Sequence, residues 1–273
     1  MTVYTCTKVN IGLNVLRRRP DGYHDLETLF VPYHGFGDRL DVEVSDELSI
    51  QIFRKEGVDW DPMQDLTVKA WRLLKADFPQ LPPVGIRLWK DAPVGAGLGG
   101  GSADAAFMLK ALNELCSLGL EQSELAAYAA RLGSDCAFFI GPAQAGGAAA
   151  GASELCPMFG SGRGEILEPF ELDLSAYELK VEIPLAAGGA PVAVSTREAY
   201  SGVVPRERRI LSLREALKLP VEQWKGVVVN DFEASVCPLH PEIPAMIADF
   251  YRRGAVYSSM SGSGSSVFGI FPR

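Results

Sequence analysis

The feature that most constrains this fold is a glycine-rich segment, residues 95–101, placed between a predicted strand and a predicted helix. Five of its seven residues are glycine. Glycine has no Cβ atom, so successive backbone N–H groups of such a segment can turn toward one anion without strain. The strand is expected over residues 84–89 and the helix starts at Ser102. Because a helix N-terminus also presents unpaired N–H groups and about half a positive charge, we predict a phosphate-binding site here.

Two other phosphate-binding motifs fit this segment less well. A Walker P-loop ends in Gly-Lys-Ser/Thr, whereas Gly101 is followed by Ser102 and the next lysine is Lys110. A dinucleotide-binding fingerprint matches residues 95–100, but it requires an acidic residue at the end of a second strand about twenty positions later. The acidic residues at that distance fall in a predicted helix. A flexible linker is a less favoured alternative, because linkers usually alternate glycine with serine or asparagine.

Composition excludes several classes of partner. The 273 residues carry 26 Lys and Arg against 34 Asp and Glu, a formal net charge of −8, so neither nucleic acid nor a membrane surface would be attracted over long range. The chain shows no run of eighteen apolar residues and no signal-peptide pattern, and we expect a soluble, cytoplasmic protein. Its five cysteines include no Cys-x-x-Cys pair, which indicates small buried side chains rather than a disulfide framework or a zinc site.

The order of patterns along the chain predicts an α+β fold, with a large first region and a smaller second region after Pro169. Residues 141–151, rich in alanine and glycine, are predicted to form a loop insertion. The expected strands are residues 3–15, 27–34, 84–89, 136–140, 177–183, 255–260 and 266–271, with a further hairpin from 40–44 and 48–53. The expected helices are residues 65–77, 102–116, 122–132, 212–219 and 241–253.

A resemblance to a known family rests on several short blocks of sequence. The glycine-rich segment and its helix resemble the second motif of the galactokinase, homoserine kinase, mevalonate kinase and phosphomevalonate kinase superfamily, the GHMP kinases. Together the blocks resemble the family of 4-diphosphocytidyl-2-C-methyl-D-erythritol kinases, and they follow the family's order over nearly the whole chain. The blocks are residues 7–15, 18–24, 26–30, 132–136, 162–167, 229–233 and 260–264.

This resemblance implies both a reaction and a fold. The reaction is phosphorylation, with ATP and Mg²⁺, of the tertiary 2-hydroxyl group of 4-diphosphocytidyl-2-C-methyl-D-erythritol, in the non-mevalonate route to isoprenoid precursors. The fold is a ribosomal-protein-S5-like N-terminal domain followed by a ferredoxin-like C-terminal domain. We expect the ATP-binding kinase domain over residues 1–160 and the C-terminal GHMP kinase domain over residues 161–273. The expected partner is a small-molecule substrate, with no nucleic acid and no membrane, and the protein is expected to be a monomer or a homodimer.

Two residues match the catalytic positions of the family. Asp135 matches the aspartate beside the acceptor hydroxyl, and Lys8 matches the lysine near it. A carboxylate beside an ammonium is a weak base, but phosphoryl transfer usually passes through a loose transition state in which orienting the hydroxyl matters more than basicity. Without the matched context, Asp135 would be interpreted as a helix-terminal cap or surface carboxylate, and Lys8 as a solvated strand residue.

The remaining matches concern the two ligands. Lys90 matches a position near the nucleotide base, and Tyr23 and Tyr200 would stack on the two faces of cytosine. The residues expected to hold the triphosphate are Pro93, Gly95, Gly97, Leu98, Gly99, Gly100, Gly101 and Ser102, of which Ser102 is also a possible ligand of Mg²⁺. The residues expected on the substrate side are Asn10, Tyr23, His24, Tyr200, Gly262 and Ser263.

The sequence departs from the family pattern at a few places. Asp65 stands where the family usually has asparagine, which replaces an amide donor with a carboxylate that only accepts. Residues 141–156 and 186–191 look like insertions, and the chain ends at Arg273, where relatives usually continue. Two alternatives therefore stay open: a GHMP kinase for another small alcohol, or a catalytically impaired nucleotide-binding homologue.

Overall fold

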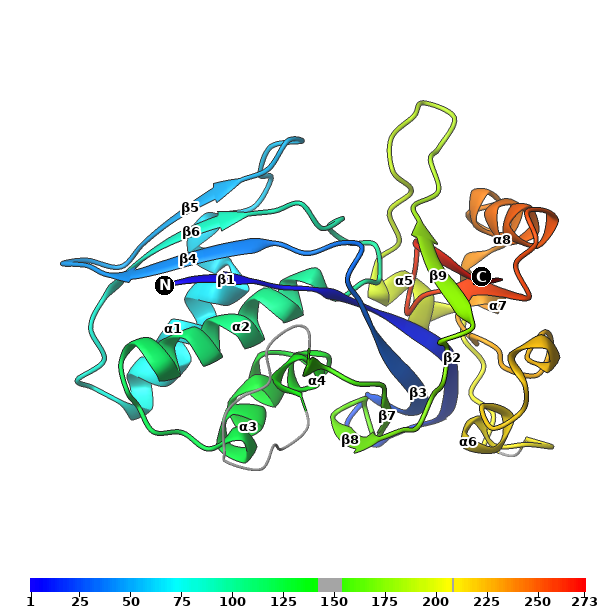
Figure 1. Cartoon of the computed structure of the whole chain (residues 1–273), viewed down its shortest axis with the longest axis horizontal. Helices are drawn as coiled ribbons and strands as arrows, with labels where there is room; N and C mark the ends of the chain where they lie inside the picture. The colour runs from blue at the N-terminus through cyan, green and yellow to red at the C-terminus, as the bar shows by residue number, and fades with distance from the viewer. Residues whose placement is uncertain (142–153, 208) are drawn as a thin grey trace. The chain divides into compact units, whose positions relative to one another are not determined.

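The computed structural model describes residues 1–141, 154–207 and 209–273 and confirms the α+β class (Figure 1). Contacts group the chain into two compact units that are not continuous in sequence. The first unit contains residues 1–7, 32–94 and 99–156, and the second contains residues 8–31, 95–98 and 157–273. Most of the predicted loop 141–151 lies outside the described residues.

The first unit is built on a four-stranded sheet with the strand order β1-β4-β6-β5. Its strands are β1 (Thr2–Tyr4), β4 (Arg39–Val44), β5 (Ser49–Phe53) and β6 (Val84–Trp89). The predicted hairpin of β4 and β5 is wrong, because β6 lies between them, antiparallel to β4 and parallel to β5. Helix α1 (Leu66–Asp77) connects β5 to β6, and such a crossover is what a parallel pair requires.

Further helical segments accompany the sheet of the first unit within the described residues. They are η1 (Pro62–Gln64), α2 (Gly100–Leu115), α3 (Gln122–Leu132) and α4 (Cys136–Ile140). Helices α1, α2 and α3 confirm the predictions, and α2 is buried on more sides than an amphipathic pattern indicates. The strand predicted at 136–140 is wrong, because this apolar run forms α4, which packs against α2 and α3. Periodicity cannot distinguish a short buried helix from a buried strand.

The second unit contains two sheets. One has the order β2-β3-β7-β8 and consists of β2 (Thr7–Arg18), β3 (His24–Tyr33), β7 (Met158–Ser161) and β8 (Ile166–Pro169). The other has the order β10-β11-β9 and consists of β9 (Tyr177–Glu182), β10 (Tyr257–Met260) and β11 (Val267–Pro272), so the last strand of the chain is the central one. The helical segments are α5 (Thr196–Ser201), α6 (Leu213–Ala216), η3 (Val221–Gln223), α7 (Glu233–Val236) and α8 (Glu242–Arg252). The sequence patterns missed β7, β8, α5 and α7, and the single strand predicted over 3–15 is wrong, because β1 and β2 are separate strands in different sheets.

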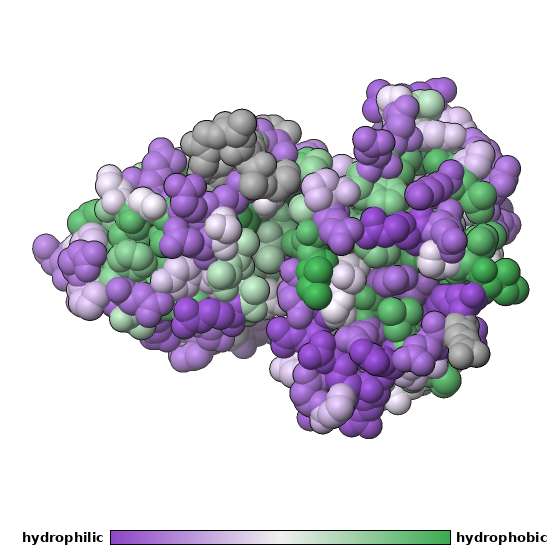
Figure 2. Space-filling model, turned by 90° about the horizontal axis from the view of Figure 1, so that it is seen from below, coloured by the Kyte–Doolittle hydropathy of each residue, from purple (hydrophilic) through white to green (hydrophobic). Residues whose placement is uncertain are grey.

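The face drawn in Figure 2 carries hydrophilic side chains with smaller hydrophobic areas among them. No helix within the described residues is long and apolar enough to cross a membrane. The five cysteines are free thiols, of which Cys6 and Cys136 are buried, as predicted, and Cys116, Cys156 and Cys237 are half-buried.

Packing in the second unit leaves no room for a side chain at Gly269 of β11. A Cβ atom there would lie 2.5 Å from Cδ2 of the buried Phe250 on α8. We expect Gly269→Ala to lower the free energy of unfolding by about 1–3 kcal/mol, because overpacking forces neighbours off their rotamers. Gly188→Ala is the control, since a Cβ atom there meets nothing within 4 Å, and its effect should stay within about 0.5 kcal/mol. Chemical denaturation of both variants measures the difference, and equal effects would contradict this packing.

Candidate active site

Lys8 lies on β2 in the second unit, and its side chain is buried. Its Nζ donates hydrogen bonds to Oδ1 of Asn10 at 2.5 Å and to the carbonyl oxygen of Gly97 at 2.9 Å. The ring of Phe30 lies 5.7 Å from the same ammonium. A buried ammonium requires such acceptors, because an isolated charge is costly to remove from water. Lys8 is therefore not a solvated strand residue, the alternative considered from the sequence without the family context.

Asn10 is engaged with the protein through its whole side-chain amide. Its Nδ2 donates to Oγ1 of Thr28 at 3.0 Å, while its Oδ1 accepts the Lys8 ammonium. The Thr28 hydroxyl in turn donates to the carbonyl oxygen of Gly12 at 2.7 Å. The backbone N–H of Asn10 donates to Oγ of Ser261. In this arrangement Asn10 orients Lys8.

Residues 95–98 of the glycine-rich segment lie against the loop that follows β10. The backbone N–H of Ser266 donates to the carbonyl oxygen of Ala96 at 3.0 Å, and Oγ of Ser261 donates to that of Gly97 at 3.3 Å. Gly97 has φ +76°, and a Cβ atom there would overlap the Ser261 carbonyl oxygen and lie 2.8 Å from that of Gly264. Two backbones can approach this closely only because residue 97 is glycine.

The predicted substrate-side loop also lies beside Lys8. Gly262 has φ +56°, and a Cβ atom there would be 3.0 Å from Oδ1 of Asn10 and 3.4 Å from Nζ of Lys8. Nδ2 of the buried Asn230 donates to the carbonyl oxygens of Met260 and Gly262 at 2.8 Å each, which fixes the loop. Ser263 follows and is half-buried. The structure therefore brings Lys8, Asn10, Gly97 and Gly262 together in the second unit.

The remainder of the glycine-rich segment begins α2 in the first unit. Gly99 has φ +73° and is the N-cap, and the first helical residues are Gly100, Gly101 and Ser102. The first N–H groups of a helix have no intrahelical acceptor, so these residues present donors for an anion. The Ser102 hydroxyl hydrogen-bonds the Cys136 thiol, and burial, partly offset by that bond, raises the pKa of Cys136 to about 12.

The other residues that are predicted to hold the triphosphate differ from one another in exposure. Gly95 is exposed with φ +71°, and Pro93 is half-buried. Leu98 is buried, and its carbonyl oxygen accepts the backbone N–H of Lys8 at 2.9 Å. Its buried side chain and its carbonyl oxygen therefore anchor the segment.

Lys90 is held by two carboxylates in the first unit. Its Nζ lies 2.5 Å from Oδ2 of Asp38 and 2.6 Å from Oδ2 of Asp104. Burial lowers the pKa of Lys90, but the charges of Asp104 and Asp38 outweigh this and raise it overall. Lys90 therefore stays protonated at neutral pH.

Asp135 directly precedes α4 in the first unit and is half-buried. It occupies the N-cap position of that helix, but its carboxylate makes no side-chain cap hydrogen bond there. Asp65, in contrast, caps α1, since its Oδ1 accepts the backbone N–H of Thr67 at 2.9 Å and the Thr67 hydroxyl at 2.7 Å. Among the described residues no group of three or more His, Cys, Asp or Glu side chains could hold a metal ion.

The aromatic residues predicted for cytosine lie in the second unit. Tyr23 is 57% exposed, with the guanidinium of Arg163 5.0 Å from its ring centre. Tyr200 stacks on His24 at 4.9 Å between ring centres and meets Phe232 edge-on at 4.7 Å. Burial, with a smaller effect of the Arg18 charge, lowers the pKa of His24 from its ordinary value, which favours the neutral ring. One face of Tyr200 is thus covered by the imidazole.

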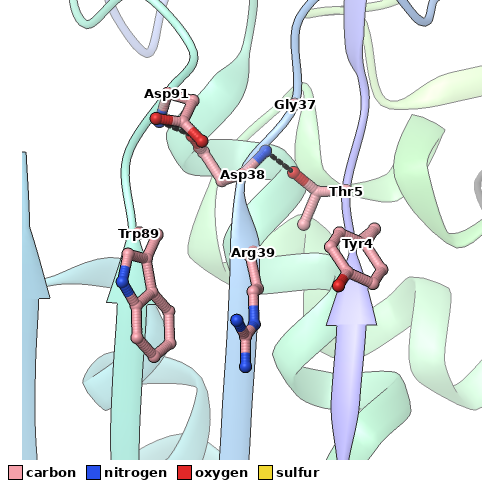
Figure 3. Close-up of a pocket in the computed structure, with 7 residues that line it drawn as sticks. All are labelled: Tyr4, Thr5, Gly37, Asp38, Arg39, Trp89 and Asp91. Carbon is pink, nitrogen blue, oxygen red and sulfur yellow. Dashed lines mark hydrogen bonds between the residues drawn. The ribbon is translucent and has the colours of Figure 1, made fainter.

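A pocket of about 450 Å³ opens on the sheet of the first unit. Tyr4, Arg39 and Trp89 stand side by side on β1, β4 and β6, and the Arg39 guanidinium lies 4.5 Å from the centre of the Trp89 ring (Figure 3). The Asp38 side chain is fully buried, so its charge is turned away from solvent.

Sequence reasoning gave no side-chain role to five residues that build these arrangements: Thr28, Asp38, Asp104, Asn230 and Ser261. Three of them, Thr28, Asn230 and Ser261, do lie in blocks that carry the family resemblance. Asp104 could have been noticed as a charge within the alanine-rich start of α2, since Ala103, Ala105 and Ala106 adjoin it in sequence. Nothing near Asp38 in sequence indicates its partner 52 residues away.

Gly95 and Gly97 offer a matched test of the loop contact, because both have φ near +70° but only Gly97 is crowded. We expect Gly95→Ala to lower the free energy of unfolding by about 1–2 kcal/mol, the cost of a left-handed alanine. Gly97→Ala adds the overlap with the Ser261 loop and should cost about 1–3 kcal/mol more. Urea denaturation without ligand measures both, and equal costs would show that the two backbones do not touch.

Comparison with known proteins identifies the family. The GHMP kinases N terminal domain matches residues 65–141, and GHMP kinases C terminal matches residues 207–273. The chain is 45% identical to 4-diphosphocytidyl-2-C-methyl-D-erythritol kinase of Bacteroides thetaiotaomicron, over 99% of this chain and 92% of that protein. It is 44% identical to the kinase of the same name from Parabacteroides distasonis, over 100% and 92%.

Comparison with solved structures supports the same family and fold. A crystal structure of 4-(cytidine 5'-diphospho)-2C-methyl-D-erythritol kinase matches with TM-score 0.72 and 31% identity, over 99% of this chain and 90% of that one. Homoserine kinase from Cytophaga hutchinsonii, at 16% identity, TM-score 0.67 and 99% and 85% coverage, shares the fold. The chain therefore belongs to the GHMP kinases and, within them, to the family of 4-diphosphocytidyl-2-C-methyl-D-erythritol kinases.

Proposed function

We propose that this protein transfers the γ-phosphoryl group of ATP to the tertiary 2-hydroxyl of 4-diphosphocytidyl-2-C-methyl-D-erythritol, in the non-mevalonate route to isoprenoid precursors. The observation that carries the proposal is the full-length similarity to kinases of that name, at 44–45% identity. The positive φ angles of Gly95, Gly97 and Gly99 support the proposal, because this backbone conformation can direct successive N–H groups at a phosphate.

The triphosphate is held by backbone rather than by a lysine. The N–H groups of Gly100, Gly101 and Ser102 supply donors at the start of α2, and the helix dipole adds attraction for negative charge. Mg²⁺ usually keeps several waters and binds substrate phosphates with one or two protein ligands. The proposal is that Mg²⁺ enters with ATP, and that the Ser102 hydroxyl, which now bonds a neutral thiol, is the protein group that meets the complex.

Lys8 and Asp135 act on the acceptor hydroxyl in this proposal. The Lys8 ammonium is oriented by Asn10 and Gly97 and stabilises the negative charge of the transferring phosphoryl group. Asp135 accepts the hydroxyl proton as the O–P bond forms, and its main task is to orient the hydroxyl for in-line attack. The proposal requires both side chains to face the same hydroxyl.

The cytidine moiety is recognised by Tyr23 and His24. The exposed ring of Tyr23 offers an open stacking face, and a neutral imidazole at His24 can both donate and accept hydrogen bonds to a pyrimidine. Tyr200 supports His24 from behind, because the two rings already stack. Gly262 and Ser263 present backbone beside Lys8, at the reacting end of the substrate.

The proposal also includes the domain limits, the cellular location and the oligomeric state. Residues 1–160 form the ATP-binding sequence domain and residues 161–273 the C-terminal one, and the two family matches fall one in each. We propose that the protein works in the cytoplasm as a monomer or homodimer without nucleic-acid partners.

Substrate choice is tested by ADP release with three alcohols: the cytidyl-linked methylerythritol, mevalonate and homoserine. Turnover of the first alone is expected. Faster turnover of mevalonate or homoserine would favour another small-alcohol kinase, and ATP binding without turnover of any of the three would identify an impaired homologue.

We expect Asp135→Asn to lower kcat by about 10²–10⁴-fold, because proton acceptance and orientation are lost together. The dissociation constant of ATP should change little. Asp249→Asn on the surface of α8 is the control and should keep full activity. Steady-state ADP release and calorimetry measure both constants. Retention of most of kcat would remove Asp135 from the mechanism.

We expect Tyr23→Ala to raise the KM of the cytidyl substrate about tenfold, the equivalent of one lost stacking contact of about 1–3 kcal/mol. The KM of ATP should not move, since stacking acts on one ligand. Tyr4→Ala is the matched control, because Tyr4 is similarly exposed at 66%. An equal rise in both KM values would argue against the cytosine contact.

A further inference from the structure

The Lys90 ammonium is largely occupied by protein partners, which leaves little of its surface and one of its three donors for a nucleotide. Its side chain is 5% exposed, and the Asp38 and Asp104 side chains that flank it are 0% and 2% exposed. The family resemblance implies a position near the nucleotide base. The ammonium has three donors, and two of them are directed at carboxylates at 2.5 and 2.6 Å.

Asp38 holds the chain that enters the glycine-rich segment. Its Oδ1 accepts the backbone N–H groups of Asp91 and Ala92 at 2.8 Å each, and the bond to Asp91 is drawn in Figure 3. Asp38 is itself fixed, because its backbone N–H donates to Oγ1 of Thr5 and its carbonyl oxygen accepts the N–H of Thr5, both at 2.9 Å. One carboxylate therefore sets the backbone of two residues and binds the ammonium of Lys90.

Asp104 holds the chain that leaves the segment. It lies in the second turn of α2, four residues after Gly100, the first residue of that helix. A Cβ atom at Gly100 would lie 3.8 Å from Nζ of Lys90 and 3.7 Å from Oδ2 of Asp38, so the helix start rests on the ion cluster. Through Lys90, the entrance and the exit of the segment are joined within the first unit.

The cluster is costly to bury. It contains two carboxylates and one ammonium, and Oδ1 of Asp104 has no hydrogen-bond partner among the described residues. Burial raises the pKa of Asp104 well above its usual value, against the opposing charge of Lys90. A hydrophobic replacement of a buried ion pair is often as stable, so such a cluster is weak evidence for stability and better evidence for fixing a geometry.

We propose that Asp38, Lys90 and Asp104 form a staple that positions the phosphate-binding backbone, with Lys90 as a positioning residue rather than a contact to the base. The staple fixes the direction of the first N–H groups of α2 relative to residues 91 and 92. Preorganised donors bind an anion more tightly because less ordering is needed on binding. This inference rests on the proposed function in that the anion is the triphosphate of ATP.

The two roles of Lys90 predict different ligand dependence. A contact to the base would matter for ATP and not for inorganic tripolyphosphate, which has no base. A staple would matter equally for both, because both use the same backbone donors. Asp38 and Asp104, which are fully buried, should then behave like Lys90.

The test compares Lys90→Met and Asp104→Asn with wild type and with the control Lys218→Met, which alters an exposed lysine of the second unit. Calorimetry with Mg²⁺ gives dissociation constants for ATP and for tripolyphosphate. We expect Lys90→Met to weaken both ligands by the same factor, about tenfold to a hundredfold, as misplaced groups do. Asp104→Asn, which is nearly isosteric, should weaken both by a smaller common factor, and the cytidyl substrate should bind all four proteins equally.

Loss of ATP affinity alone, with tripolyphosphate unchanged, would overturn the staple and place Lys90 at the base. Unchanged affinity for both ligands would also overturn it. Because Lys90→Met leaves two buried carboxylates, Asp104→Asn provides the same comparison in a protein that keeps the ammonium and its acceptors. Failure of the wild type to bind either ligand would instead refute ATP binding, so the two failures are distinguishable.

Discussion

The close approach of two backbones at Gly97 is the contact on which the acceptor side of the site depends. The carbonyl oxygen of Gly97 accepts both the Lys8 ammonium and the Ser261 hydroxyl, so one residue fixes a charge and a loop together. Any side chain at 97 would separate them. Asn10, Asn230 and Gly262 complete the arrangement, and each of them satisfies a buried polar group rather than meeting solvent.

Local patterns predicted much of this fold, and the failures have physical causes. The bounds of α3 and β6 follow from periodicity alone. The partner of β5 could not be predicted in this way, because strand pairing depends on the crossover through α1. The run at 136–140 could not be assigned to a helix or a strand, because it is apolar on every side in either conformation. The glycine-rich segment was recognisable because its backbone requires glycine. The partners of Lys90 were not, because residues 38, 90 and 104 meet only in the folded chain.

Matching a sequence to a family's motifs indicates which residues belong to a site more readily than it indicates what their side chains contact. Asn10 was expected to contact substrate, and the structure occupies its amide with Thr28 and Lys8. Tyr200 was expected to stack on cytosine opposite Tyr23, and in the structure one of its faces stacks on His24. In both cases the side-chain contacts within the protein depend on neighbours 18 and 176 positions away, which the motif does not contain.

The interleaving of the two units has a consequence for how the protein can be dissected. The chain leaves one unit and enters the other after residues 7, 31, 94, 98 and 156, and β2 and β3 share a sheet with β7 and β8. A fragment cut near residue 160 would deprive that sheet of strands it needs, and the sheet's exposed edge would then be open to aggregation. Neither unit is expected to survive as an excised piece, so split reporters, truncations and limited proteolysis should inactivate both together.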